Sequence, residues 1–528
     1  MLNNPANRKY LIVLLFILSF LLYAKTLNYK FVWDDERIHL TNNEALMRGD
    51  IASFWEKPYS GMYIPASYTT WTAIKGLARG KRQLSPKTFH ALNIAIHSIN
   101  CVLVLLLLLL LFKHQLNAFI GALLFLLHPL QVESVAWISE FRGLYSAMFS
   151  LTALLFVFRH LAKNEQICLR TWLFSKAFLL ASVFFGLALL SKPSAVALPF
   201  VAGILVWCFY KQHFRAVAKS LFIWLIMTIP VFIITMQSQP NEMLYTTITL
   251  WQRFFIVGDT LFFYFSKLLL PYPLAACYGY TPEAVSQSYF SNFSTLLYIA
   301  AFLWFFIKRK QFPLLFGGFA VITVCLLPVS GLVPFEYQKH STVADRYMYF
   351  AMVGAALWIP TIRDFTKKYS WMEYTTAALL PLYVILTVQQ TSNWKNEFTV
   401  WDHTLKHYQN NPKAYYNRGV ENSKMKRYSD AINDYTQCLT LQPNYLDALF
   451  NRANAYENMH NMNAAFADYN QYLSVDSTDG SVYFKRAFLN YLTNNSDEAI
   501  RDANKAEQLG FPVDNKFKQA LNKKSAMN

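Results

Sequence analysis

The feature that most constrains this chain is a succession of long apolar runs in its first 390 residues. A helix that crosses a bilayer needs about 20 mostly apolar residues, because its backbone polar groups find no other hydrogen-bond partners in hydrocarbon. Hydrophobic residues make up 54% of the chain and charged residues only 15%, which agrees with a membrane protein. Eleven runs are candidate spans: 10–24, 90–112, 117–129, 143–159, 174–191, 195–210, 220–236, 294–307, 312–333, 346–361 and 374–390. The sequence therefore predicts an all-α, polytopic membrane helix bundle.

Lys and Arg set the expected orientation of these spans, because short cytoplasmic loops carry an excess of both. With Arg8 and Lys9 placed in the cytoplasm, the loops expected on that side are all basic: 113–114, 159–176, 211–219, 308–310 and 363–368. A span at 252–270 would move the 308–310 loop outside, so we expect a re-entrant or interfacial helix there. The net charge of +17 then mostly reflects Lys and Arg in the loops expected on the cytoplasmic side, and no nucleic-acid partner is expected. The first run is expected to remain as an anchor.

From about residue 390 the composition changes, and a repeat of 34 residues begins. Its three units start with similar segments at 414–418, 448–452 and 482–486, followed in register by Ala431, Ala465 and Ala499 and by Asp434, Asp468 and Asp502. This period is typical of tetratricopeptide repeats. The expected domains are a membrane domain at 1–390, a linker or capping helix at 391–412 that contains Trp394 and Trp401, three repeats at 413–514, and a C-terminal tail at 515–528. Because eleven is odd, the N-terminus is expected in the cytoplasm and the repeats outside.

The polar clusters of the membrane half fall on the expected outer side. Asp34 and Asp35 follow the first span, where adjacent carboxylates can take a proton from a hydroxyl, bind a metal or cap a helix. A second cluster, at 128–142, contains His128, Glu133, Trp137, Glu140 and Arg142. A helix beginning after Pro129 would put Glu133, Trp137 and Glu140 on one face, suited to a sugar. The alternative is an interfacial helix anchored by Trp137.

Two cations, Lys192 and Arg346, stand in the turns 191–193 and 345–347 on the same side. Charges at the membrane edge are costly, which makes them candidates for a functional site. Arg offers a planar fork and Lys a point charge to a lipid-linked phosphate. The alternative is that Arg346 pairs with its neighbour Asp345 or extends to the interface. Six cysteines without paired spacing, and the lack of HExxH, Walker, GxSxG or dinucleotide motifs, predict no metal site and no cofactor.

Together the segments 31–35, 128–140, 191–193 and 344–347, with the terminal repeats, resemble the transmembrane and tetratricopeptide-repeat O-mannosyltransferases and their prokaryotic relatives. These belong to the GT-C superfamily of polyprenyl-phosphate-sugar-dependent glycosyltransferases. The resemblance implies an inverting, metal-independent transfer from a polyprenyl-phosphate sugar to a protein or glycan acceptor. It implies Asp34 or Asp35 as general base and Lys192 and Arg346 as phosphate ligands. Sugar or acceptor contacts would come from His128, Glu133, Trp137, Glu140, Arg142 and Asp345.

Two positions depart from the family pattern. The stretch Phe141-Arg142-Gly143 replaces a charged Arg-Lys-Asp stretch, and Ile64 stands where relatives often have Arg. The sugar is therefore left open between mannose and another hexose, in an enzyme expected in a bacterial inner or cell membrane. A transporter or flippase and a repeat-bearing assembly scaffold are the alternatives. A transporter should show polar residues near the midplane and a two-fold repetition of spans, and neither is evident in the sequence.

Overall fold

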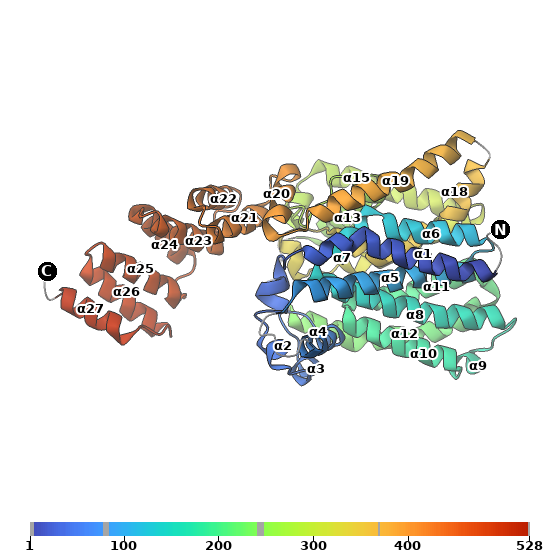
Figure 1. Cartoon of the computed structure of the whole chain (residues 1–528), viewed down its shortest axis with the longest axis horizontal. Coiled ribbons are helices and arrows are strands. Elements are labelled where there is room, and N and C mark those ends of the chain that lie inside the picture. Colours follow the sequence, from blue (N-terminus) through green and yellow to red (C-terminus); the bar gives the residue numbers. More distant parts are fainter. Residues whose placement is uncertain (1–4, 78–83, 240–247, 368–369, 526–528) are drawn as a thin grey trace. The chain divides into compact units, whose positions relative to one another are not determined.

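The structure, a computed structural model, describes residues 5–77, 84–239, 248–367 and 370–525. Its elements are helices throughout this part of the chain, apart from one isolated bridge between Tyr59 and Met62. The chain divides into two compact units, Met1–Asn396 and Glu397–Asn528 (Figure 1).

The first unit is a bundle of long apolar helices that run side by side (Figure 1). They are α1 (Pro5–Tyr23), α5 (Pro86–Leu111), α8 (Phe141–Lys163), α10 (Lys176–Ser191), α12 (Phe214–Ser238), α13 (Leu250–Leu269), α15 (Tyr289–Ile307) and α19 (Ser370–Ser392). Shorter helices complete it: α6 (Gln115–Leu127), α11 (Leu198–Phe209), α16 (Pro313–Leu326), α17 (Met348–Ala356) and α18 (Ile359–Thr366). Helices α16 and α17 touch through glycine, because a Cβ on Gly318 would lie 2.4 Å from the Gly354 carbonyl oxygen.

The expected count of eleven spans is not reached. Among the described residues, five helices are long and apolar enough to cross a membrane: Arg8–Asn28, Pro86–Leu111, Ile138–Leu161, Lys211–Ser238 and Tyr289–Lys310. A bent pair, Gln115–Leu127 with Pro129–Ala136, would be a sixth. The difference arises because several apolar runs are broken into short helices. The run 346–361, for example, is shared between α17 and α18. The segment expected to be re-entrant or interfacial, 252–270, lies in the 20-residue helix α13 except for its last residue, and α13 packs on α15.

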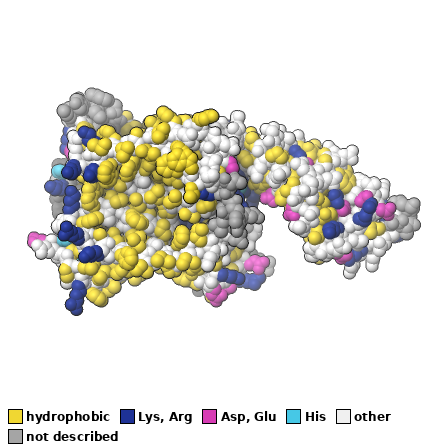
Figure 2. Space-filling view, turned by 180° about the vertical axis from the view of Figure 1, so that it is seen from behind, with side chains coloured by type: hydrophobic (Ala, Val, Ile, Leu, Met, Phe, Trp, Pro, Cys, Tyr) yellow, Lys and Arg dark blue, Asp and Glu magenta, His cyan; other side chains and the backbone are white. Residues whose placement is uncertain are grey.

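Charge divides the two ends of this bundle. Figure 2 shows Lys and Arg gathered at one end of the apolar surface, the end at which the N-terminus lies. Exposed basic residues occupy its short connections, among them Lys113, Lys163, Lys211 and Lys308. The small helices α2 (Glu44–Arg48), α3 (Ala52–Glu56) and α4 (Pro65–Leu77) lie at the opposite end (Figure 1).

The second unit is a stack of helix pairs: α21 (Pro412–Lys424) with α22 (Tyr428–Leu441), α23 (Leu446–Asn458) with α24 (Met462–Val475), and α25 (Gly480–Leu492) with α26 (Ser496–Gln508). Within each pair an Arg forms a bidentate bond to an Asp 16 residues later: Arg418–Asp434, Arg452–Asp468 and Arg486–Asp502. Small residues fill the contact between the two helices, as in Ala431, Ala465 and Ala499, which are fully buried. The three predicted repeats are therefore built on one pattern.

Both ends of this stack carry an extra helix. The Nη1 atoms of the three arginines also reach a residue 16 positions earlier: Asp402, Thr436 and Asn470. Because these positions are spaced by 34, helix α20 (Glu397–His407) occupies the place of the second helix of a preceding repeat. At the other end, residues expected to be a tail form α27 (Asn515–Ser525), because Phe517 and Leu521 cover the last pair.

Candidate functional site

The loop after α1 separates its two carboxylates. Asp35 is fully buried: Oδ2 accepts a hydrogen bond from the Val32 amide at 3.0 Å, and Oδ1 accepts bonds from the amide and hydroxyl of Ser139. Burial raises the pKa of Asp35 to about 7, although these donors favour its charged form. Asp34 stays partly exposed. Trp33, just before them, has a φ of 56°, a left-handed conformation that is strained for a non-glycine residue. Asp35 therefore fixes the loop, whereas Asp34 is only partly buried.

The block at 128–142 is not a single helix, the case in which Glu133, Trp137 and Glu140 were expected to share one face. Helix α7 (Val132–Ala136) ends before Trp137, whose backbone is extended, and a short 3-10 turn (Ile138–Glu140) follows. The prediction of one helical face was wrong, because the extended residue resets the spacing. Glu133, Trp137 and Glu140 nevertheless converge, since each one contacts Arg346.

Arg346 is the centre of this convergence. Its Nη1 donates to Oε1 of Glu133 at 2.6 Å, and its backbone amide donates to Oε2 of the same carboxylate at 2.8 Å. Arg346 thus pairs with a residue 213 positions earlier rather than with its neighbour Asp345. Four aromatic rings surround the guanidinium, with Cζ lying 4.1–5.8 Å from the centroids of Tyr337, Tyr347, Trp137 and Trp33. This cage holds a buried cation in one orientation.

Glu140 gathers a further set of cations. Its Oε2 accepts a bond from Lys192 Nζ at 2.7 Å, and its Oε1 lies 3.1 Å from Nε of Arg142 and 3.8 Å from Nε of Arg346. With Glu133, the cluster holds three cations and two carboxylates. It therefore carries one unmatched positive charge at a largely buried position, which favours an anionic ligand.

His128 and Asp345 lie in different surroundings from the other predicted contacts. Nε2 of His128 lies 3.1 Å from the Leu268 carbonyl oxygen, and its Nδ1 accepts a bond from the Leu130 amide. Asp345 accepts a bond from the Tyr278 hydroxyl at 2.6 Å, and burial raises the pKa of this carboxyl well above its usual range. Both side chains connect elements of the bundle and lie outside the pocket described next.

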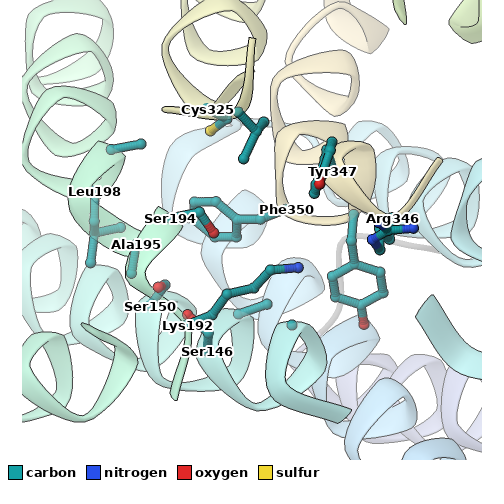
Figure 3. Close-up of a pocket in the computed structure, with 15 residues that line it drawn as sticks. Ser146, Ser150, Lys192, Ser194, Ala195, Leu198, Cys325, Arg346, Tyr347 and Phe350 are labelled. Carbon is teal, nitrogen blue, oxygen red and sulfur yellow. The ribbon is translucent and has the colours of Figure 1, made fainter. Parts of the chain in front are cut away.

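A small pocket, with a cavity volume of about 50 Å³, adjoins the charged cluster (Figure 3). Lys192 and Arg346 contribute its basic groups, and Ser146, Ser150 and Ser194 contribute hydroxyls. The remaining lining is mostly apolar and comes from α8, α11, α16, α17 and the turns beside them: Ala147, Ala195, Ala197, Leu198, Cys325, Val329 and Phe350. Asp34 is not part of this lining. It follows Trp33, whose ring stacks on Trp137 at 4.8 Å and lies beside Arg346.

Sequence reasoning missed several residues of this site. Ser139 belongs to it through its bonds to Asp35, Tyr337 through its ring beside Arg346, and Gly143 through the space it leaves beside Glu140 and Lys192. The sequence signal that could have identified Tyr337 is its position in the loop that precedes Arg346. Among the described residues, no three His, Cys, Asp or Glu side chains gather closely enough to hold a metal ion. The metal-independent reaction stays a prediction.

Known families and proteins resemble both parts of the chain. Tetratricopeptide-repeat models match residues 412–445 and 446–479. Protein O-mannosyl-transferase F38B6.6 of Caenorhabditis elegans is 23% identical over 82% of this chain and 63% of its own length. Protein O-mannosyl-transferase TMTC3 of Mus musculus is 24% identical over 81% of this chain and 50% of its own length. Tmtc1 of Drosophila melanogaster, also a protein O-mannosyl-transferase, is 29% identical over 28% of this chain and 18% of its own length.

The matched region thus spans at most 63% of each of these relatives. A solved structure, the APC/C hetero-tetramer Cut9-Hcn1, aligns over 92% of this chain and 96% of its own at 13% identity, with a TM-score of 0.23. The apolar helices, the repeats and these homologues together identify a multi-pass membrane protein that carries tetratricopeptide repeats and is related to the protein O-mannosyl-transferases.

Proposed function

We propose that this chain is an integral-membrane glycosyltransferase that moves a hexose, such as mannose, from a polyprenyl phosphate to a hydroxyl of a protein or glycan acceptor. The observation that carries the proposal is the pocket that Lys192 and Arg346 share with an apolar lining. A lipid phosphate has the same two-part character. Its anionic head suits the basic end, and its first isoprene units suit the apolar walls.

Asp34 is the general base of the proposed reaction. It takes the proton of the acceptor hydroxyl as the hydroxyl oxygen bonds to the anomeric carbon and the bond from that carbon to the phosphate oxygen breaks. The electron pair leaves with the polyprenyl phosphate, whose added negative charge Lys192 and Arg346 stabilise. Attack opposite to the leaving group inverts the anomeric centre. The partial exposure of Asp34 and the burial of Asp35 support this assignment.

The reaction takes place on the extracytoplasmic face of the membrane, in a bacterial inner or cell membrane. Supporting this side, the basic end of the bundle coincides with the N-terminus, and helices α2–α4 lie at the other end (Figures 1 and 2). The tetratricopeptide repeats dock the acceptor protein, because such stacks bind peptide segments along their concave surface.

The test is transfer from a polyprenyl-phosphate hexose to an acceptor protein by the full chain in nanodiscs, followed by mass spectrometry. Asp34→Asn should lower kcat by about 10²–10⁴-fold, the usual contribution of a general base. Glu36→Gln is the matched control, because Glu36 is an exposed carboxylate two residues away and should keep full activity. Full activity of Asp34→Asn would remove the base assignment. Transfer from a nucleotide sugar but not from the lipid donor would overturn the proposed donor.

A further inference from the structure

Lys192 is the cation of the site with the fewest other partners. Arg346 is also bound to Glu133 and caged by four rings, and Arg142 also contacts Met62 and Trp137. In the described part of the chain, Lys192 has one carboxylate partner, Glu140, and its Nζ lies 5.7 Å from the centroid of the Tyr347 ring. Glu140 can therefore release Lys192 and keep two cations.

The pocket reaches Lys192 but hardly reaches Glu140. The Lys192 side chain is 15% exposed, whereas that of Glu140 is 1% exposed. Figure 3 shows Lys192 extended across the pocket, with its ammonium group directed to the side on which Arg346 lies. An anion that enters the pocket therefore meets the ammonium group first. It then competes with Glu140 for the donors of this group.

Gly143 makes room for the Lys192–Glu140 pair. It lies on α8 three residues after Glu140, and a Cβ on it would stand 2.7 Å from Oε2 of Glu140 and 3.2 Å from Nζ of Lys192. Any side chain at this position would push into the pair. Glycine inside a helix is unfavourable by roughly 0.5–1 kcal/mol relative to alanine, so its presence here agrees with a steric need.

We propose that Glu140 is a resident counter-anion that competes with the lipid phosphate for Lys192 and thereby promotes release of the product. This inference rests on the proposed function. The sugar donor is a phosphodiester with a single negative charge, whereas the product is a monoester that carries about −1.5 to −2 at neutral pH. A site with an unmatched cation binds the product more tightly than the donor. Glu140 opposes this by taking Lys192 back when the phosphate leaves.

Equilibrium binding of a polyprenyl phosphate without sugar to the full chain in phosphatidylcholine nanodiscs tests this competition. Glu140→Gln should tighten binding about five- to tenfold, because the phosphate no longer has to break an ion pair. Lys192→Gln should weaken binding, and Glu140→Gln added to it should tighten binding by a smaller factor than in the wild type, because only the contacts of Glu140 with Arg142 and Arg346 then remain. In transfer assays, Glu140→Gln should lower kcat when product release limits turnover, and added polyprenyl phosphate should inhibit it more strongly.

Two further measurements keep the test decisive. Thermal unfolding checks that Glu140→Gln is folded, and Glu140→Asp, a shorter carboxylate that keeps the charge, should tighten binding in the same direction by a smaller factor. If folded Glu140→Gln and Glu140→Asp bind the polyprenyl phosphate no more tightly than the wild type does, the counter-anion role is overturned and the proposed function stands. If the wild-type chain binds no polyprenyl phosphate, the proposed donor fails and the counter-anion role fails with it.

Discussion

Asp35 and Ser139, 104 residues apart, are joined by two hydrogen bonds to a single oxygen: the Ser139 amide donates to Oδ1 of Asp35 at 2.9 Å, and the Ser139 hydroxyl donates to the same atom. Ser139 directly precedes Glu140, and Asp35 directly follows Asp34. The bonds therefore tie the proposed base to the cluster that holds Lys192 and Arg346. This buried carboxylate accepts three hydrogen bonds and holds the first loop in place. Its protonation state should therefore affect the geometry of the site.

Ser139→Ala should shift the acid limb of the pH–rate profile to higher pH. Burial raises the pKa of Asp35 to about 7, and the Ser139 hydroxyl lowers it by stabilising the charged form. Removal of this donor therefore raises the pKa further, and activity that needs ionised Asp35 is lost at a higher pH. The measurement is kcat/KM across neutral pH. Ser134→Ala is the control, because its buried hydroxyl has no hydrogen-bond partner among the described residues. An acid limb that stays at the same pH in Ser139→Ala would contradict the dependence on Asp35.

Asp35→Asn should destabilise the membrane unit. An Asn oxygen can still accept the bonds from Ser139, but its amide group then faces the Val32 amide, so two donors meet at a buried position. An unsatisfied buried polar group costs about 1–3 kcal/mol. We expect a lower midpoint of thermal unfolding in detergent, together with reduced kcat. Glu36→Gln should leave this midpoint unchanged, since that side chain is exposed. A midpoint equal to that of the wild type in Asp35→Asn would show that the hydrogen bonds of the Asp35 carboxylate are not needed for stability.

Much of this organisation is predictable from local sequence patterns. The membrane class follows from apolar runs, and the repeat unit follows from a 34-residue period. The choice of Glu133, Glu140, Lys192 and Arg346 as candidate site residues follows from the cost of charges at a membrane edge. These signals need no knowledge of which distant segments pack together, because hydropathy, periodicity and charge are properties of single segments.

The remaining features depend on tertiary contacts. Asp34 and Asp35 are equivalent in the sequence, and only the structure shows that Asp35 is buried and bound by Val32 and Ser139. A helix after Pro129 would align Glu133, Trp137 and Glu140, but Trp137 adopts an extended backbone and stacks on Trp33. The number of spans was overestimated because apolar composition alone does not reveal where a run breaks into short helices that pack against one another.

The buried pair of Glu133 and Arg346 should show strong coupling in a double-mutant cycle. Arg346→Met leaves a buried carboxylate without its cation, which costs about 3–5 kcal/mol, and Glu133→Gln has a similar effect on the guanidinium. The double variant should lose much less than the sum of the two. Glu44 and Arg48 are the matched control. Their atoms are also 2.6 Å apart, but both side chains are more than 70% exposed, so their coupling should be at most about 0.5 kcal/mol. Additive losses for Glu133 and Arg346 in denaturant unfolding would contradict the pairing.

Asp402→Ala should release helix α20 from the repeat stack. Arg418 makes a bidentate bond to Asp434 and also donates to Asp402 at 3.1 Å. The equivalent bonds in the next two repeats, spaced by 34 residues, run from Arg452 to Thr436 and from Arg486 to Asn470. Without Asp402, Arg418 keeps Asp434, so α21 and α22 should retain their protection while the amides of α20 exchange faster. Hydrogen exchange of the full chain with mass spectrometry measures this difference. Lys406→Ala is the control, because Lys406 is 70% exposed and lies 3.8 Å from the same carboxylate. Unchanged exchange in α20 would mean that packing alone, and not the bond between Arg418 and Asp402, holds this helix in the position of a preceding repeat.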